Sequence, residues 1–338
     1  MNSSMDYFPE DLDLDLDLDY WNFSDFNISD YGDQKNPALF SAFYVLVCLV
    51  GLVGNALAVY VVLRHRHMWS AINIYVFNIA LGDLVYMLCL LLFAVETAHS
   101  FWPMGVFLCR VFWALSTLIS FSSIYFLVIM SISECVRAYF PVFSVKKLGL
   151  KAALVISICT WVICLLLGIP FFMYAYVDSF NSCKIWSEPS TIWSIAITCY
   201  QLVMTFAWPL LLICISLILT AGQVRAQKNM ADSPQASAKE GVVLVFGLTL
   251  VYVIIWLPMN VLEIMSALGA VKELSMVTYY LLSIVPYLKC CVYPIMYGFL
   301  SPSFKECFMK VLCCSKAEEA GRPPECSTEK HDEKSLNC

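Results

Sequence analysis

Residues 38–63 read ALFSAFYVLVCLVGLVGNALAVYVVL, a run without a single charged side chain. A helix needs about 20 consecutive apolar residues to cross the hydrocarbon core of a bilayer, and a single segment satisfies its own backbone there only as a helix. This stretch is therefore predicted to be a membrane-spanning helix.

Six further apolar runs of similar length follow along the chain. Four of them hold no charged residue, and the other two hold one each, Asp83 and Lys289. The run 189–224 is longer than one crossing requires, so we expect loop at one or both of its ends. The predicted fold class is an all-α membrane protein, a seven-transmembrane helix bundle with a short amphipathic eighth helix. The seven candidate spans are residues 38–63, 69–95, 111–133, 152–177, 189–224, 241–262 and 274–304.

The composition argues against a soluble protein. Apolar residues make up 60% of the 338 residues and charged residues 14%, whereas soluble domains have about 25% charged residues. The mean hydropathy is +0.75. The sequence contains no evident zinc-ligand set, phosphate-binding loop or nucleophile triad, so it indicates no enzyme, metal, cofactor or nucleic-acid partner. Eight of the 16 cysteines lie inside apolar runs, where they behave as small hydrophobes.

Basic residues indicate how the bundle is oriented. Because basic loops stay in the cytosol, we expect an extracellular N-terminus and a cytoplasmic C-terminus in the plasma membrane. The loops after the first, third and fifth spans hold Arg64, Arg66, Arg137, Lys146, Lys147, Lys151, Arg225, Lys228 and Lys239. The expected parts of the chain are an extracellular disordered acidic tail (1–37), the bundle (38–300), an amphipathic membrane-surface helix (301–314) and a cytoplasmic disordered tail (315–338).

The N-terminal tail concentrates the negative charge. Residues 1–35 contain ten acidic residues and one basic residue, while the rest of the chain has a net charge of +3. Such a composition cannot bury a core, and an acidic tail attracts basic partners. We expect electrostatic capture of a cationic peptide or small protein, the alternative being a solvated spacer. Three sequons, at Asn2, Asn22 and Asn27, predict glycosylation in this tail.

Short motifs inside the spans occur in a characteristic order. They are Gly54-Asn55, Leu81-Gly82-Asp83, Trp102-Pro103, Trp256-Leu257-Pro258 and Tyr293-Pro294-Ile295-Met296-Tyr297. Over about residues 38–314 the series resembles the rhodopsin-like (class A) G-protein-coupled receptors. The stretch from Asn73 to Asp83 is most similar to the branch that contains somatostatin, opioid and neuropeptide receptors. The resemblance implies a peptide receptor in the lipid bilayer that engages a heterotrimeric G protein, arrestin or both.

The same resemblance implies a disulfide bond at the extracellular face. Cys109, at the outer end of the third span, and Cys183, in the second outer loop, resemble the family's bridging pair. Both face an oxidising compartment in the expected orientation, where a disulfide persists. Two free thiols are the alternative.

Several side chains resemble modification sites. Tyr7, Tyr20 and Tyr31 stand beside acidic residues, as do the sulfated tyrosines of chemokine and complement-peptide receptors. Cys313 and Cys314 end the predicted amphipathic helix and suggest palmitoylation.

The sequence departs from the family at the cytoplasmic end of the third span. The usual Asp-Arg-Tyr is here Ser133-Glu134-Cys135. The resemblance implies that the arginine holds the resting state and later swings toward the G protein. Glu134 has the opposite charge and cannot do this, although Arg137, one turn later, is placed to pair with it.

Two other parts of the same relay also differ. The family's fifth-span tyrosine is replaced by Leu217, and the seventh-span Asn-Pro-x-x-Tyr keeps Pro294 and Tyr297 but has Tyr293 in place of the asparagine. Three linked changes predict an activation relay that is altered or unused.

A lysine inside the seventh span is the sharpest anomaly, because an intramembrane charge is costly and marks function by default. The resemblance implies a small polar cavity, often holding sodium, between Asp83, Ser123 and asparagines of the seventh span. Lys289 and Tyr293 occupy those asparagine positions. We therefore expect the Lys289 ammonium to take the place of the sodium ion and to pair with Asp83. The alternatives are a lysine that snorkels elsewhere or is held neutral.

An outer cavity lined by aromatic and polar groups is the expected ligand site. Aminergic, opioid and somatostatin receptors carry an aspartate at the position of Ser116, so we do not expect an amine ligand to be anchored there. Glu96 and Glu263 are alternative anchors for a cationic side chain, unless they face loop water. The candidate ligand-contact residues are Glu96, Trp102, Ser116, Trp256, Glu263, Tyr280, Ser283 and Tyr287.

Other functions remain as alternatives. The leading one is an atypical, scavenger-type receptor that internalises ligand with little G-protein signalling. A retinal photoreceptor is disfavoured because its lysine would stand at Tyr287, and two residues turn a helix by about 200°, which points Lys289 away from that pocket. A transporter is disfavoured because the seven spans show no evident internal repeat.

Overall fold

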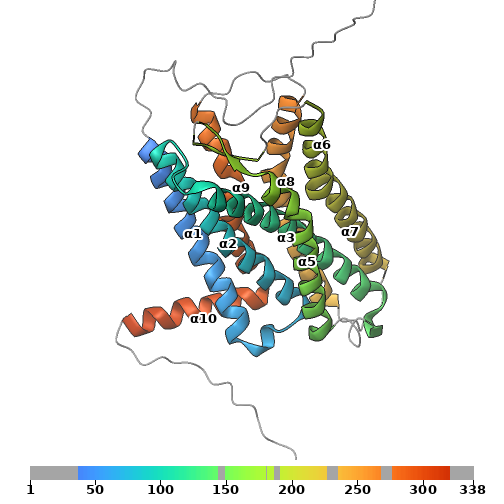
Figure 1. The fold of residues 1–338 in the computed structure, drawn as a ribbon. Coiled ribbons are helices and arrows are strands. Elements are labelled where there is room, and N and C mark those ends of the chain that lie inside the picture. The colour runs from blue at the N-terminus through green and yellow to red at the C-terminus, as the bar shows by residue number, and fades with distance from the viewer. Residues whose placement is uncertain are drawn as a thin grey trace, which may run out of the picture.

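The computed structural model describes residues 37–143, 149–179, 181–185, 191–226, 235–267 and 276–319. Within these ranges the chain forms a bundle of long helices (Figure 1), and seven helical segments are long and apolar enough to cross a membrane. The predicted fold class is confirmed. The membrane-spanning elements are α1 (Pro37–Arg64), α2 (Ala71–His99), α3 (Gly105–Tyr139), α5 (Leu150–Tyr174), α6 (Thr191–Leu202) continued by η3 (Val203–Ala207) and α7 (Trp208–Ala226), α8 (Gln235–Ala267) and α9 (Met276–Leu300).

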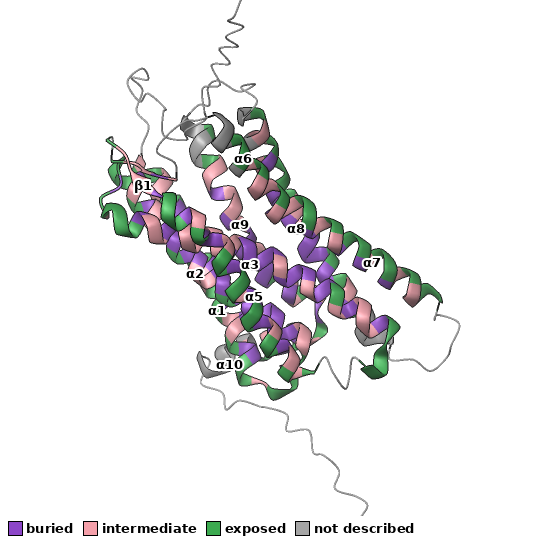
Figure 2. Ribbon diagram, turned by 45° about the vertical axis from the view of Figure 1, so that its right-hand side comes forward, coloured by how far each residue is buried: buried purple, intermediate pink, exposed green. Residues whose placement is uncertain are grey.

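The third span, α3, forms the centre of the bundle. It packs against α2, α5, α7 and α8, while α1 packs against α2 and α9. Figure 2 shows that the exposed residues lie along the helices of the bundle. Many of these exposed residues are large and apolar, as expected where the surrounding solvent is lipid. Several polar side chains, among them Asn55, Asn78 and Asp83, are buried inside the bundle.

The ends of the helices differ from the expected spans. The expected loop within residues 189–224 is wrong for the described part of that run, because α6, η3 and α7 continue one another from Thr191 to Ala226. The fourth span ends earlier than predicted, because Tyr176 and Val177 form strand β1 (Tyr176–Val177). Apolar composition marks the part of a helix that meets lipid and does not mark where the helix itself begins or ends.

The fifth span contains a π-helical segment, η3, just before Pro209. Proline has no N–H to donate to the carbonyl four residues earlier, which here belongs to Thr205. The hydroxyl of Tyr252 on α8 donates a hydrogen bond to that carbonyl at 2.7 Å. An irregular backbone segment inside the fifth span is thus linked directly to the sixth span.

A further helix, α10 (Pro302–Glu319), follows α9 after Ser301 and runs across the end of the bundle (Figure 1). Phe304 and Cys307 are buried on its inner face. The Cys307 thiol lies 3.5 Å from Nε2 of His67, which belongs to the short helix η2 (Arg66–Met68). The amphipathic helix expected to begin near residue 301 is therefore present, and it extends beyond residue 314.

Candidate functional site

A small hairpin closes one end of the bundle, named here the hairpin end. Strands β1 and β2 (Cys183–Lys184) are antiparallel, with Val177 opposite Cys183. A disulfide joins Cys183 to Cys109 in the first turns of α3. The predicted bridge is confirmed, and it fixes the hairpin over the third span.

Two residues expected to contact ligand hold this hairpin in place. A carboxylate oxygen of Glu96 accepts the backbone N–H of Cys183 at 3.4 Å. The backbone N–H of Trp102 donates to the carbonyl of Asn181 at 2.6 Å, and its indole N–H donates to the carbonyl of Gly105 at 2.9 Å. Glu96 and Trp102 are thus engaged with the protein itself rather than pointing freely into a cavity.

The hairpin also carries an ion pair of its own. Nζ of Lys184 lies 2.6 Å from Oδ2 of Asp178, and both side chains are nearly buried. The backbone N–H of Ser182 donates to Asp178 Oδ1 at 2.7 Å. These bonds stiffen the turn between the strands and keep its charges paired.

Aromatic residues line the interior below the hairpin. The rings of Tyr86 and Tyr287 stack with centroids 4.3 Å apart, joining α2 to α9. The rings of Tyr252 and Trp256 stack at 5.8 Å within α8. Ser116 is buried on α3. Tyr86, Tyr252, Trp256 and Tyr287 are each at most 8% exposed, so these aromatic side chains pack within the core of the bundle.

Of the three other residues expected to contact ligand, the structure describes the side chain of one. Ser283 is half-buried on α9, one turn before Tyr287. The side chains of Glu263 and Tyr280 lie outside the described residues. The expected modification sites also lie outside them, namely Asn2, Asn22, Asn27, Tyr7, Tyr20, Tyr31 and the side chains of Cys313 and Cys314.

An ion pair lies between α2 and α9 in the interior of the bundle. The Lys289 ammonium donates to the Asp83 carboxylate, and both side chains have 0% exposure. The ammonium also lies 5.3 Å from the ring centroid of Tyr86 and 5.7 Å from that of Tyr293. Both rings present π electrons to the cation, which adds to its stabilisation in a site without water contact.

The neighbours of this pair connect further helices to it. The Asn55 side-chain amide on α1 donates to the carbonyl of Cys290 at 2.7 Å, directly beside Lys289. Ser123 on α3 is buried, and neither its hydroxyl nor Oδ2 of Asp83 has a hydrogen-bond partner among the described residues. Lys289 thus pairs with Asp83, one of the residues that the resemblance assigns to an ion site.

The contribution of this ion pair to the stability of the fold depends on its burial. Moving either charge out of water is expensive, and a buried pair contributes little net stability compared with apolar residues. Removing one partner is different, because it leaves an uncompensated charge and typically costs about 3–5 kcal/mol. Asp83 and Lys289 therefore depend strongly on each other.

A second pair of charged residues lies at the end of the bundle opposite the hairpin end. This end, where α10 lies, is named here the α10 end. The carboxylate of Glu134 on α3 is 4% exposed and pairs with Arg137 one turn later. A Cβ atom added to Gly241 on α8 would overlap this carboxylate. Glu134 therefore fills the space left by a missing side chain on the facing helix, and Ser133 and Cys135 are only half-buried beside it.

The retained tyrosine of the seventh span is fully buried between two other rings. The centroid of Tyr297 lies 6.3 Å from that of Tyr293 and 5.6 Å from that of Phe304 on α10. Pro294 lies in α9 between the two tyrosines and close to Gly54 on α1. The end of the seventh span is thus packed against α1 and α10.

A comparison with known proteins decides the family. A family model described as the 7 transmembrane receptor (rhodopsin family) matches residues 54–297. The chain belongs to this rhodopsin family of seven-transmembrane receptors. This receptor is therefore a multi-pass membrane protein of the plasma membrane and not an enzyme.

Several somatostatin receptors are similar to this receptor along most of its length. Somatostatin receptor type 5 of Bos taurus is 32% identical over 329 residues, covering 92% of this chain and 89% of the relative. The type 5 receptor of Rattus norvegicus is 35% identical over 277 residues, covering 80% and 76%. The type 3 receptor of Homo sapiens is 32% identical over 293 residues, covering 84% and 70%. The resemblance to the branch that contains the somatostatin receptors is confirmed.

Sequence reasoning missed two members of the charged sites. Tyr86 stands three residues after Asp83, a spacing that places both on one face of α2, so its contact with Lys289 was open to prediction. No sequence pattern pointed to Gly241, because its contact with Glu134 depends on how closely α8 approaches α3.

Proposed function

We propose that this receptor binds an extracellular peptide or small basic protein and signals to heterotrimeric G proteins through an altered relay. The observation that carries the ligand class is the similarity to somatostatin receptors over 92% of the chain. The acidic N-terminal tail supports a cationic ligand, because opposite charge raises the rate of encounter.

The proposed orientation places the hairpin end outside the cell and the α10 end in the cytosol. Basic residues support it, because Arg64, Arg66 and Arg225 all lie in or next to loops at the α10 end. Helix α1 begins at the hairpin end (Figure 1), which is the extracellular end in this orientation. Glycosylation, sulfation and palmitoylation stay predictions for side chains that lie outside the described residues.

The altered relay is proposed from the two charged sites. The resemblance implies that an arginine at position 134 would swing toward a G protein, whereas Glu134 is paired with Arg137 and faces Gly241. In the core, Lys289 supplies a fixed cation where the family holds a removable one. Both features support a receptor whose resting state is held by built-in charges.

The second candidate function is a scavenger-type receptor that binds and internalises ligand without G-protein signalling. The same pairing of Glu134 with Arg137 favours this function, because a carboxylate repels the negatively charged groups that an arginine would attract. Arrestin is the expected partner in that case.

Two measurements test these proposals. Somatostatin and a panel of other basic peptides and chemokines are tested for binding to cells that express the receptor with and without residues 1–34. We expect a basic ligand whose association slows when the tail is removed. G-protein activation by that ligand is then compared between the wild type and Glu134→Arg. Weak activation that Glu134→Arg raises supports the altered relay, no activation by the wild type supports the scavenger, and strong wild-type activation excludes it.

A further inference from the structure

The ammonium of Lys289 is held by two aromatic rings as well as by a carboxylate. Its Nζ lies over the ring of Tyr86, 5.3 Å from the centroid, and over that of Tyr293 at 5.7 Å. The carboxylate of Asp83 is its ion-pair partner. A cation within about 6 Å of a ring centroid is attracted by the negative face of the ring. One charged group and two π faces therefore recognise the ammonium together.

Other contacts hold the two rings in position. The ring of Tyr86 stacks on that of Tyr287, with centroids 4.3 Å apart and an interplanar angle of 21°. The hydroxyl of Tyr293 donates to the carbonyl of Leu248 on α8 at 3.4 Å. Tyr86 is 4% exposed and Tyr293 is fully buried. Both rings are thus fixed by groups other than the lysine.

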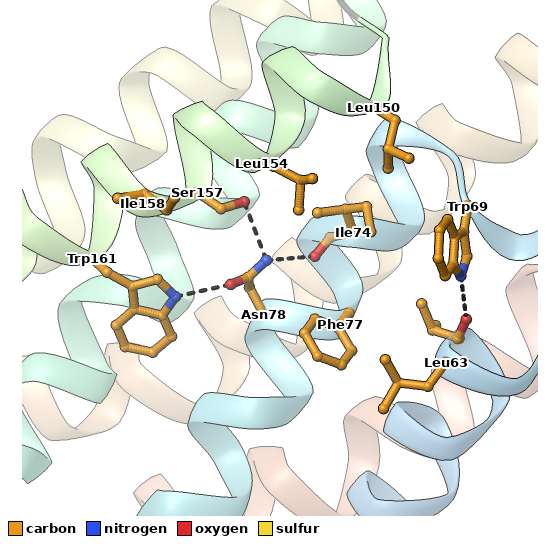
Figure 3. Close-up of a pocket in the computed structure, with 11 residues that line it drawn as sticks. Leu63, Trp69, Ile74, Phe77, Asn78, Leu150, Leu154, Ser157, Ile158 and Trp161 are labelled. Atoms are coloured by element: carbon orange, nitrogen blue, oxygen red, sulfur yellow. Dashed lines mark hydrogen bonds between the residues drawn. The ribbon is translucent and has the colours of Figure 1, made fainter.

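A second buried polar group on α2 is recognised in a different way. The side-chain nitrogen of Asn78 donates to the Ser157 hydroxyl at 3.1 Å, and its oxygen accepts the indole N–H of Trp161 at 2.9 Å (Figure 3). Here an aromatic residue uses the N–H at its edge to bind a neutral oxygen. Beside Lys289 the rings instead lie under the ammonium, and an aromatic face attracts a cation.

This set of groups suits an organic ammonium better than a metal ion. A metal ion such as sodium leaves its water shell only where oxygen ligands replace the water. The faces of Tyr86 and Tyr293 supply π electrons and no such ligand. An alkylammonium ion has three N–H donors for a carboxylate, and aromatic faces are the usual surroundings of bound organic ammonium groups.

We propose that Asp83, Tyr86 and Tyr293 form a binding site that is selective for an alkylammonium ion over sodium, and that Lys289 is its resident ligand. Asp83 supplies the charge, and the two tyrosines determine the specificity. The site takes up a free small alkylammonium ion when the lysine side chain is removed. This selectivity requires neither the extracellular ligand nor a G protein.

The melting temperature of the purified full-length Lys289→Asn receptor tests the selectivity. The receptor is titrated with methylammonium chloride and with sodium chloride, at an ionic strength held constant with N-methylglucamine chloride. An ion that binds the native state raises the Tm. A desolvated cation–π contact contributes roughly tenfold in affinity. We therefore expect half-maximal stabilisation at a methylammonium concentration at least about tenfold below that of sodium. Neither ion should change the Tm of the wild type.

A second substitution in the same receptor tests the role of the ring. Lys289→Asn/Tyr86→Leu should lose the preference for methylammonium. The matched control is Lys289→Asn/Tyr44→Leu, because Tyr44 is a fully buried tyrosine of α1 whose ring stacks on that of Phe93 at 5.4 Å. This control should keep the preference even where its Tm is lower. The ratio of the two half-maximal concentrations is measured, so a loss of stability alone does not change the result.

A measurement with the lysine in place keeps the proposal testable if Lys289→Asn does not fold. Tyr86 is replaced by phenylalanine and by its mono-, di- and trifluorinated analogues, since fluorine withdraws π electrons from the ring face with little change of shape. The Tm should fall with each added fluorine at position 86, whereas the same series at Tyr44 should show no such fall. Equal half-maximal concentrations of the two ions, a preference that survives Tyr86→Leu, or a Tm unaffected by fluorination at position 86 would each overturn the proposal.

Discussion

The ammonium of Lys289 on α9 forms an ion pair with the carboxylate of Asp83 on α2, and neither side chain is exposed. The aromatic rings of Tyr86 and Tyr293 lie within 6 Å of the same ammonium, at 5.3 and 5.7 Å. A charge that cannot leave therefore neutralises Asp83 in a region where the family resemblance implies an exchangeable cation.

The first prediction concerns sodium. An ion that binds the native state raises the melting temperature as its concentration rises. Because Lys289 already occupies the site, the Tm of the receptor should be the same in sodium chloride and in choline chloride of equal ionic strength. Lys289→Asn restores the residue that the resemblance implies and should make the Tm depend on sodium. A sodium-dependent wild type would show that the ammonium does not fill the site.

The second prediction concerns the contact between Gly241 and Glu134. A leucine at position 241 collides with the carboxylate, and overpacking of this kind costs about 1–3 kcal/mol. Gly241→Leu should therefore lower the Tm, and Glu134→Ala in the same chain should recover most of the loss. Gly222→Leu is the control, because a Cβ at Gly222 meets nothing within 4 Å. An equal loss with and without Glu134 would rule out this contact.

Seven apolar runs were enough to predict the number of spans, because a charge in lipid is rare and costly. The position of Lys289 was equally visible, since it interrupts such a run. Tyr176 and Val177, by contrast, belong to the same apolar run as the fourth span but form a strand. They pair with Lys184 and Cys183, and the disulfide holds Cys183 against α3. The role of Glu96 in holding the Cys183 backbone was likewise hidden, because it depends on tertiary contact.

The third prediction concerns the irregular fifth span. Tyr252→Phe removes the hydroxyl that donates to the Thr205 carbonyl at 2.7 Å and leaves that carbonyl short of a donor. The loss of one hydrogen bond should cost about 0.5–1.5 kcal/mol, measured as a lower Tm. Tyr60→Phe, at a half-exposed position on α1, should leave the Tm unchanged. Identical values for the two variants would mean that the bond contributes nothing.

The fourth prediction concerns ligand choice. The somatostatin relatives are expected to carry an aspartate at the position of Ser116, which is buried on α3. Ser116→Asp should raise the affinity for somatostatin about tenfold or more, because a charge-assisted hydrogen bond contributes about 1.5–3 kcal/mol. Ser116→Asn matches the size without the charge and should not. Equal affinities of the two variants in a radioligand competition assay would place the cationic anchor elsewhere.

The mutual dependence of Asp83 and Lys289 is tested most directly by a double-mutant cycle on the amount of folded receptor at the cell surface. Lys289→Met alone should cost about 3–5 kcal/mol and strongly reduce surface expression, because it leaves the Asp83 carboxylate buried without a partner. Lys289→Met combined with Asp83→Asn should restore expression close to that of the wild type. Equal surface expression of the single and the double mutant would contradict a built-in cation in the core.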